Sequence, residues 1–115
     1  MLGVIDRESL RKRIEGGADF VLVDALPPLT YAMGHLPGAI NISAEWIDDR
    51  ARRRIPDLEQ EVVVYCADEG CDSSVIVANR LVELGYRNVL HYVDGKRDWV
   101  AAGLPLEGRR VAQSR

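Results

Sequence analysis

The sequence has few of the features that mark several large classes of protein. Only two of its 115 residues are cysteines, too few for the disulfide framework of a small secreted protein. No apolar run approaches the roughly 20 residues of a membrane-spanning helix, and the first residues include no signal-peptide stretch. A net charge of −3 provides no basic surface for nucleic acid. We therefore expect a reduced, cytoplasmic compartment, with no nucleic acid and no membrane as partner.

The composition indicates a soluble globular protein. Hydrophobic residues make up 47% of the chain and charged residues 29%, the balance of a folded domain rather than a disordered one. A chain of 115 residues can bury one modest core. We predict a single domain over residues 1–115, with its core at about 6–106 and a tail at 107–115.

Apolar runs alternate with stretches of helical spacing. Strands are predicted at 20–24, 39–42, 62–65 and 89–93. Helices are predicted at 7–15, 48–54, 73–84 and 97–102, with Asp6 capping the first. Pro27 and Pro28 predict a loop, followed by one helical turn at 31–33. Strands that alternate with helices are typical of a parallel α/β sheet.

Cys66 stands where a buried strand stops and a helix is about to begin. The residues from Val62 to Tyr65 are β-branched or aromatic, and a short polar turn separates Cys66 from a helix that opens at Ser73. Ligand sites in open α/β sheets form at the carboxyl ends of strands. Backbone N–H groups at a helix N-terminus favour anions, thiolates included. The placement makes Cys66 a candidate nucleophile.

Four separate stretches resemble the rhodanese-like domain family, in its single-domain sulfurtransferase form. They are the strand and acid at 21–24, the string Gly34-His35-Leu36-Pro37-Gly38-Ala39-Ile40-Asn41, the strand–Cys–loop–helix unit at 62–84, and Gly95-Lys96-Arg97-Asp98-Trp99 followed by Gly103-Leu104-Pro105. The resemblance spans residues 6–106. It implies a three-layer fold, with a five-stranded parallel sheet and helices on both faces. It also implies that Cys66 is the nucleophile of a persulfide-forming loop.

The loop after Cys66 departs from the family pattern. Members that use thiosulfate usually carry arginines there, whereas this chain has Ala67 beside the cysteine and Cys71 or Asp72 near the end of the loop. Leu26 also replaces an arginine that often follows the first acid. The loop holds three acidic residues, Asp68, Glu69 and Asp72, and no basic residue, so we expect thiosulfate to be a poor donor.

We predict a sulfurtransferase that carries sulfane sulfur as a persulfide on Cys66. The donor and the thiophilic acceptor are small molecules or proteins, and no metal or organic cofactor is needed. The substrate-binding residues are those whose backbone amides surround the sulfur: Ala67, Asp68, Glu69, Gly70, Cys71, Asp72 and Ser73. Two alternatives remain: a catalytically weak or inactive rhodanese-type interaction or regulatory module, and a Cys66/Cys71 thiol redox protein. The oligomeric state stays open.

Several other residues have two interpretations each. Cys71 is a second thiol that resolves or accepts sulfur, or simply a small residue near a helix start. Asp24 orders the loop backbone or titrates near the site. His35 is a hydrogen-bonded structural imidazole rather than a base. Trp99 is a core residue or a wall of the pocket, and Trp46 packs in the core or a loop.

Two further features have a default interpretation. The charge run at 48–54 is a solvated helix face, with an anion-attracting rim as the alternative. His91 lies within a strand pattern and is predicted to be an ordinary strand residue.

Overall fold

The computed structural model describes residues 2–108. The strands are β1 (Leu2–Val4), β2 (Val21–Asp24), β3 (Ile40–Asn41), β4 (Glu61–Tyr65) and β5 (Asn88–Tyr92). The helices are α1 (Arg7–Glu15), α2 (Pro28–Met33), α3 (Ile47–Arg54), α4 (Ser73–Glu83) and α5 (Gly95–Ala101). No helix in this range is long and apolar enough to cross a membrane.

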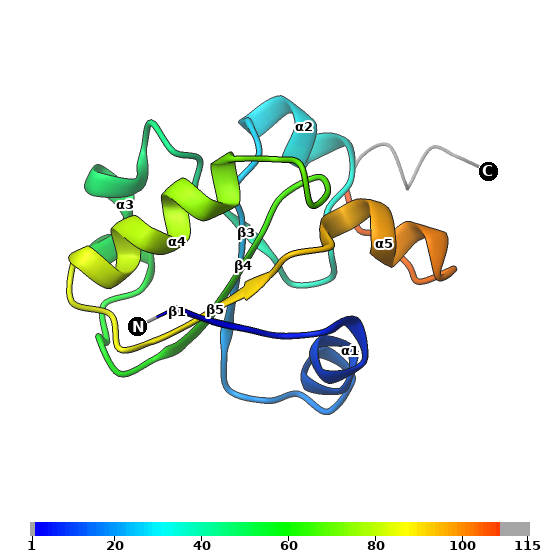
Figure 1. Cartoon of the computed structure of the whole chain (residues 1–115), viewed down its shortest axis with the longest axis horizontal. Coiled ribbons are helices and arrows are strands. Elements are labelled where there is room, and N and C mark those ends of the chain that lie inside the picture. Colours follow the sequence, from blue (N-terminus) through cyan, green and yellow to red (C-terminus); the bar gives the residue numbers. More distant parts are fainter. Residues whose placement is uncertain (1, 109–115) are drawn as a thin grey trace.

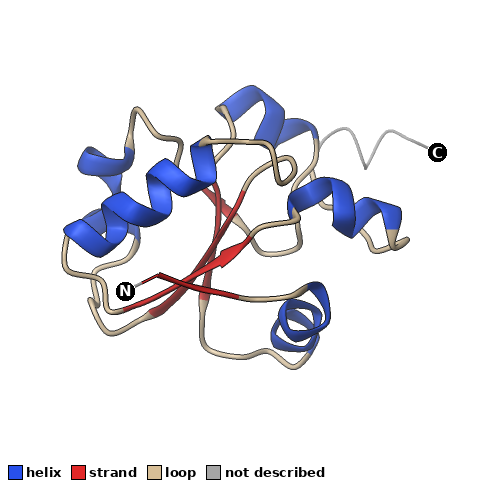
Figure 2. Ribbon diagram, viewed as in Figure 1, coloured by secondary structure: helices blue, strands red, loops and turns tan. Residues whose placement is uncertain are grey.

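The five strands form one sheet in the order β1-β5-β4-β2-β3, and every neighbouring pair is parallel. Strand β4 lies at its centre, between β2 and β5, with Asp24 paired to Tyr65 and Tyr65 to Tyr92. Helices cover both faces of the twisted sheet (Figure 1, Figure 2). The predicted five-stranded parallel sheet with helices on both faces is confirmed.

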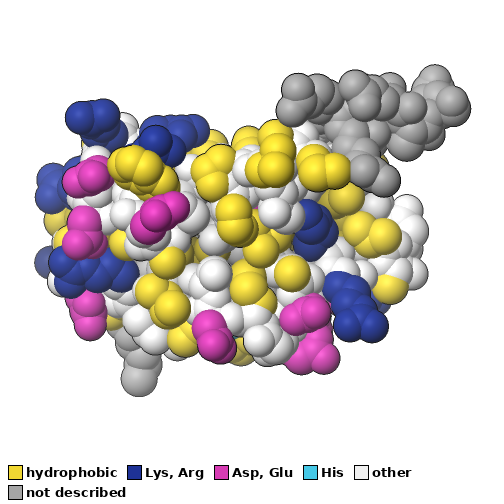
Figure 3. Space-filling model, turned by 90° about the horizontal axis from the view of Figure 1, so that it is seen from above, with side chains coloured by type: hydrophobic (Ala, Val, Ile, Leu, Met, Phe, Trp, Pro, Cys, Tyr) yellow, Lys and Arg dark blue, Asp and Glu magenta, His cyan; other side chains and the backbone are white. Residues whose placement is uncertain are grey.

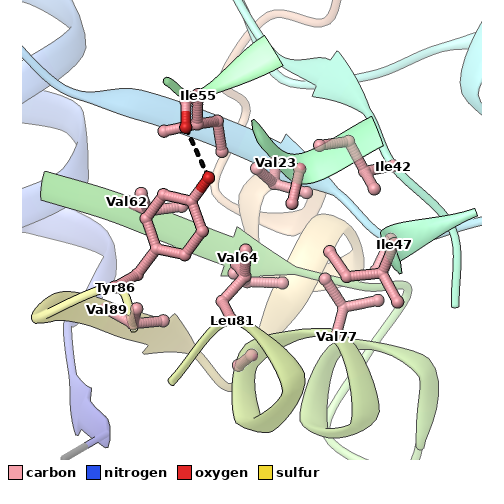
Figure 4. Close-up of a cluster of buried hydrophobic side chains, with 13 residues drawn as sticks. Val23, Ile42, Ile47, Ile55, Val62, Val64, Val77, Leu81, Tyr86 and Val89 are labelled. Atoms are coloured by element: carbon pink, nitrogen blue, oxygen red, sulfur yellow. Dashed lines mark hydrogen bonds between the residues drawn. The ribbon is translucent and has the colours of Figure 1, made fainter. Parts of the chain in front are cut away.

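One face of the sheet packs against α3 and α4 (Figure 4). Val62 and Val64 of β4 are fully buried against Val77 and Leu81 of α4. Tyr86 closes this cluster, and its hydroxyl donates a hydrogen bond to the carbonyl of Ile55. Alternation along β4 sends Val63 and Tyr65 to the opposite face, where they meet α1 and α5. The central strand is therefore buried on both sides, as its continuous apolar run predicts.

Local sequence signals explain most of the helix boundaries. The carboxylate of Asp6 accepts a hydrogen bond from the amide of Ser9 at 2.8 Å and caps α1 as predicted. Pro28 opens α2 rather than continuing a loop, because a proline at the first helical position has no amide to leave unpaired. The predicted single turn at 31–33 is therefore the end of a longer helix.

Two chain segments differ from the prediction. Strand β1 was missed; it is three residues long and pairs only with β5, so it carries almost no local pattern. Glu107, predicted to lie in the tail, pairs through its backbone with His35, and its carboxylate accepts a hydrogen bond from the amide of Gly38. The ordered fold thus extends past residue 106. The rest of the predicted tail, 109–115, lies outside the described residues.

Candidate functional site

The carboxyl ends of β2 and β4 meet beside the loop that follows Cys66. Asp24 ends β2 and is paired with Tyr65, the last residue of β4. The next amide, of Ala25, donates to the carbonyl of Tyr65 at 3.0 Å. Cys66 follows directly and is only 1% exposed. The predicted nucleophile therefore sits at the inner edge of the loop, held by the central strand.

The first turn of α5 clamps the backbone of Cys66. The amide of Lys96 donates to the carbonyl of Cys66 at 3.0 Å, and the amide of Arg97 donates to the carbonyl of Ala67 at 2.8 Å. Gly95 makes this approach feasible: a Cβ there would lie 2.8 Å from the Cys66 oxygen. In the sequence this segment belongs to a family motif, and its turn is expected near the Cys66 loop, but the hydrogen bonds are not visible there. Its role depends on hydrogen bonds between segments about 30 residues apart.

Asp68 builds the turn that brings the chain back over Cys66. Its side-chain Oδ1 accepts a hydrogen bond from the amide of Gly70 at 2.9 Å. Its backbone carbonyl accepts one from the amide of Cys71 at 3.2 Å. Two of the loop amides predicted to face the sulfur are therefore already used by Asp68. Those of Ala67 and Glu69 make no hydrogen bond to the described residues and remain free to bind an anion.

Cys66 and Cys71 are joined as a disulfide across this loop. Their Cα atoms are 6.2 Å apart, inside the range that a disulfide allows. The structure thus differs from the simpler interpretation of Cys71 as a small residue near a helix start. Spacing alone did not show it, because the turn at Asp68 decides where Cys71 points.

Charge around the loop is more balanced than the loop sequence implies. Arg97 of α5 lies 3.8 Å from the carboxylate of Asp68, and its side chain is 79% exposed. Lys96 directs its ammonium group to the carbonyl of Gly34 at 2.9 Å. These two bases come from a distant segment, so the prediction of three acids without a base holds for the loop sequence and not for its surroundings.

The arginine run lies on α3, which packs beside α4 (Figure 1). Among the described residues, none of its four arginines forms an ion pair with the loop. Arg50 instead lies over the ring of Trp46, 4.7 Å from the centroid. Trp46 is 39% exposed, so the predicted core or loop packing is replaced by this surface contact. The solvated helix face is the interpretation that the contacts support.

Asp24 and Tyr65 form a buried hydrogen-bond chain beneath the site. The Tyr65 hydroxyl donates to Asp24 Oδ2 at 2.7 Å and accepts from the Leu36 amide at 3.0 Å. Asp24 Oδ1 also accepts from the Leu26 amide at 2.8 Å. Burial raises the pKa of Asp24, and these hydrogen bonds offset only part of that effect. Asp24 thus orders backbone, the role that sequence favoured, while the Tyr65 hydroxyl was missed.

We expect Asp24→Asn to gain stability relative to wild type as the pH rises above 3.8, the ordinary pKa of the carboxyl. With a raised pKa, folded Asp24 binds its proton more tightly than the unfolded chain does, so ionisation lowers the wild-type free energy of unfolding. The variant does not lose stability in this way, because an asparagine side chain does not ionise. Urea unfolding at several pH values measures the difference.

Asp48→Asn is the matched control for this trend. A hydrogen bond from Arg80 lowers the pKa of Asp48, so its ionised form favours folding and the pH trend has the opposite sign. If the Asp24→Asn difference stays constant with pH, or follows the Asp48→Asn trend, the pKa of Asp24 is not raised in the folded protein.

The remaining predicted residues have mainly structural contacts. The Nδ1 atom of His35 is 2.8 Å from the carbonyl of Tyr31, and the two rings stack, as expected for a structural imidazole. Trp99 is 2% exposed and donates its indole N–H to the carbonyl of Pro105, so it belongs to the core and not to a pocket wall. His91 is less ordinary than predicted: it is buried and hydrogen-bonded at 2.8 Å to Ser74 of α4.

Two hollows flank the loop. One of about 180 Å³ is lined by Ala25, Pro27, Ser43, Ala44, Glu45 and Ser73. Within it, the buried Oγ of Ser43 has no partner among the described residues. The other, of about 290 Å³, lies between Glu69 of the loop and the Asp94–Ala101 segment. Cys66 lines neither hollow, so the disulfide form keeps the predicted nucleophile covered.

Apolar side chains form much of the surface next to the loop. Val75 and Ile76, in the first turn of α4, are exposed, as are Leu29 and Met33 of α2. Viewed from above, Lys and Arg gather mostly toward one end of the molecule, and hydrophobic side chains spread across the middle (Figure 3). Apolar side chains such as Val75 and Ile76 thus share the surface beside the loop with the exposed Arg97.

Comparisons with known proteins agree with this fold. Residues 6–102 match the family model described as a rhodanese-like domain. The chain is 35% identical over 106 residues to a sulfurtransferase of Allochromatium vinosum, covering 92% of this chain and 95% of the relative. It is 36% identical over 103 residues to the HTH-type transcriptional regulator Rv0324 of Mycobacterium tuberculosis; this match covers 90% of this chain but only 44% of the regulator.

Among solved structures, the chain resembles the solution NMR structure of the rhodanese-like domain from the Anabaena sp. Alr3790 protein. The TM-score is 0.84 and the sequence identity 30%. The match covers 100% of this chain and 84% of that one.

Proposed function

Because the chain belongs to the rhodanese-like domain family, we propose that it transfers sulfane sulfur through a persulfide on Cys66. The observation that carries the proposal is the position of Cys66: it directly follows the central strand, and α5 holds its carbonyl within the loop. The family contains sulfurtransferases, including the Allochromatium relative. A thiol held rigidly at a sheet edge suits repeated attack on a sulfur donor.

The proposed reaction has two displacement steps. In the reduced protein, the Cys66 thiolate attacks the outer sulfur of the donor, and the bond between that sulfur and the rest of the donor breaks. The donor remainder leaves as an anion. A thiophilic acceptor then attacks the outer sulfur of the Cys66 persulfide, which regenerates the thiolate. Free amides such as those of Ala67 and Glu69 stabilise the anionic sulfur in both steps.

The surroundings of the loop favour a donor other than thiosulfate. Asp68, Glu69 and Asp72 oppose a doubly charged anion, and the main compensating charge, Arg97, is exposed and already near Asp68. Apolar residues such as Val75 and Ile76 adjoin the loop. An organic or protein-borne persulfide, in the reducing cytoplasm, fits these features better. We propose such a donor, with a small thiol or a protein thiol as acceptor.

A second candidate function is thiol redox chemistry with Cys66 and Cys71. The disulfide across the loop favours it, since two thiols that pair within one loop can exchange electrons with another dithiol. In that function, oxidation would remove two hydrogen atoms and would need no sulfur donor.

The persulfide proposal is tested with reduced Cys71→Ser protein, in which Cys66 has no thiol partner. After incubation with benzenethiosulfonate or with an organic persulfide such as cysteine persulfide, intact-mass measurement is expected to show one added sulfur atom. Peptide mapping should locate it on Cys66, and excess dithiothreitol should remove it. The Cys66→Ser/Cys71→Ser protein should gain none. If neither donor leaves sulfur on Cys71→Ser, the persulfide proposal is wrong.

A further inference from the structure

The second thiol of the loop is placed where it can act on sulfur bound to the first. Cys66 and Cys71 are bonded although they stand five positions apart in the sequence, with four residues between them. The turn that returns the chain to Cys66 is held by two hydrogen bonds to Asp68. The disulfide therefore lies across a turn that these hydrogen bonds hold. A site with Cys66 as its single nucleophile would not need a second thiol at this position.

The two cysteines have different surroundings. Cys66 is buried at the end of β4, and the amides of α5 hold its backbone. Cys71 is partly exposed and lies just before Asp72, which occupies the N-cap position of α4 without a side-chain capping hydrogen bond. The positive end of α4 favours a thiolate at Cys71, while Asp72 opposes it. Cys71 is thus the more accessible of the two thiols, while the sulfur of Cys66 is held at the inner side of the loop.

We propose that, after a donor has placed sulfur on Cys66, Cys71 releases that sulfur as hydrogen sulfide. This further activity rests on the proposed persulfide function. The Cys71 thiolate attacks Sγ of Cys66, forming the Cys66–Cys71 bond present in the structure. The bond between Cys66 Sγ and the outer sulfur breaks, and that sulfur leaves as hydrosulfide, which takes a proton from water. Two electrons pass from the two cysteines to the sulfane sulfur.

A dithiol reductant completes the cycle. Its first thiolate attacks the loop disulfide and its second closes a disulfide of its own, which returns two thiols to the loop. Net, one sulfane sulfur is reduced to sulfide and one dithiol is oxidised. Because the bonded form covers Cys66, the protein cannot accept another sulfur until it is reduced. The loop therefore couples sulfide release to the supply of dithiol.

Intramolecular attack explains why the second thiol is in the same loop. A reactant held next to its target acts at an effective concentration far above that of free thiols in solution. Hydrosulfide is also a better leaving group than an ordinary thiolate, since it is the less basic of the two. Attack at Cys66 Sγ is therefore expected to compete with transfer to an external acceptor.

The test compares reduced wild type with Cys71→Ser, each at low protein concentration with benzenethiosulfonate and no free thiol. Wild type should release about one sulfide per chain and lose two hydrogen atoms in mass. Cys71→Ser should instead retain one added sulfur, with sulfide release slower by about 100-fold or more. Cys71→Ser/Asn79→Cys, whose second thiol lies elsewhere on α4, should behave like Cys71→Ser.

The outcomes separate the two proposals. If wild type and Cys71→Ser both keep the added sulfur, or if both release sulfide equally fast, the release step is wrong and the persulfide proposal stands. If wild type forms the disulfide without a matching amount of sulfide, the donor has merely oxidised the thiols, and the release step is again wrong. If Cys71→Ser gains no sulfur, the persulfide proposal fails, and the release step fails with it.

Discussion

Replacement of Cys66 by serine is expected to lower the rate of sulfur transfer by about 10³-fold or more. The reaction needs a sulfur nucleophile that forms a sulfur–sulfur bond and later gives it up, and a hydroxyl at the same place can do neither. Transfer from benzenethiosulfonate to cyanide measures the rate, with Cys71→Ser present in both proteins, because a dithiol added to keep the loop reduced would itself take up the sulfur. Cyanide is a simple thiophile and makes no demand on an acceptor surface.

The fold must survive the substitution for this result to be informative. Cys66 is buried, and a serine hydroxyl there without a partner costs about 1–3 kcal/mol. Cys66→Ala avoids that cost and should show the same loss of activity, so the two variants together separate chemistry from folding. Circular dichroism and urea unfolding confirm the folded state. A Cys66→Ala protein that keeps wild-type turnover would remove Cys66 from the mechanism.

The arrangement of strands and helices was largely predictable from the sequence. The unbroken apolar run before Cys66 predicts a strand buried on both faces, and β4 is that strand. Asp6, an acid just ahead of the helical run, predicts the start of α1. Such signals are local, since each depends on residues within a turn or a strand of one another. Strand β1 was not predicted, because three residues at a sheet edge are too few to show an alternating pattern.

The site was harder to predict, because its geometry depends on contacts between distant segments. The loop sequence shows acids and a second cysteine, but not that Asp68 uses its hydrogen bonds to turn the chain toward Cys66. Nor does it show that α5 supplies both the clamp and the nearest arginine, Arg97. The resemblance to a family indicated that the Gly95 segment matters. Only the structure shows the reason, which is contact with the backbone of Cys66.

The second large effect is expected where the first turn of α5 contacts the backbone of Cys66. Gly95→Ala is expected to lower the free energy of unfolding by about 2–4 kcal/mol, the combined cost of left-handed strain and overpacking. Gly95 has a φ of 70°, a conformation that alanine adopts only with strain. Its new Cβ would also lie 2.8 Å from the oxygen of Cys66 and 2.9 Å from the carbonyl carbon of Ala67. Backbone atoms cannot move aside as a flexible side chain would.

The same clash should damage sulfur transfer. Relief of the contact must push the Cys66–Ala67 backbone away from α5 and weaken the hydrogen bonds from Lys96 and Arg97. A nucleophile displaced by as much as 1 Å loses about 100-fold in rate. We therefore expect a rate loss of about that size in the folded fraction of Gly95→Ala. The measurement is transfer to cyanide at a temperature where the variant remains folded.

Gly103→Ala is the matched control, since it changes the same residue type at nearly the same backbone angle. Gly103 has a φ of 79°, and nothing lies within 4 Å of the Cβ that alanine would add. This variant should incur only the left-handed strain, about 1–2 kcal/mol, and should keep the wild-type transfer rate because no contact reaches the loop. If both variants lose stability equally and both keep full activity, contact between Gly95 and the Cys66 backbone does not position the nucleophile.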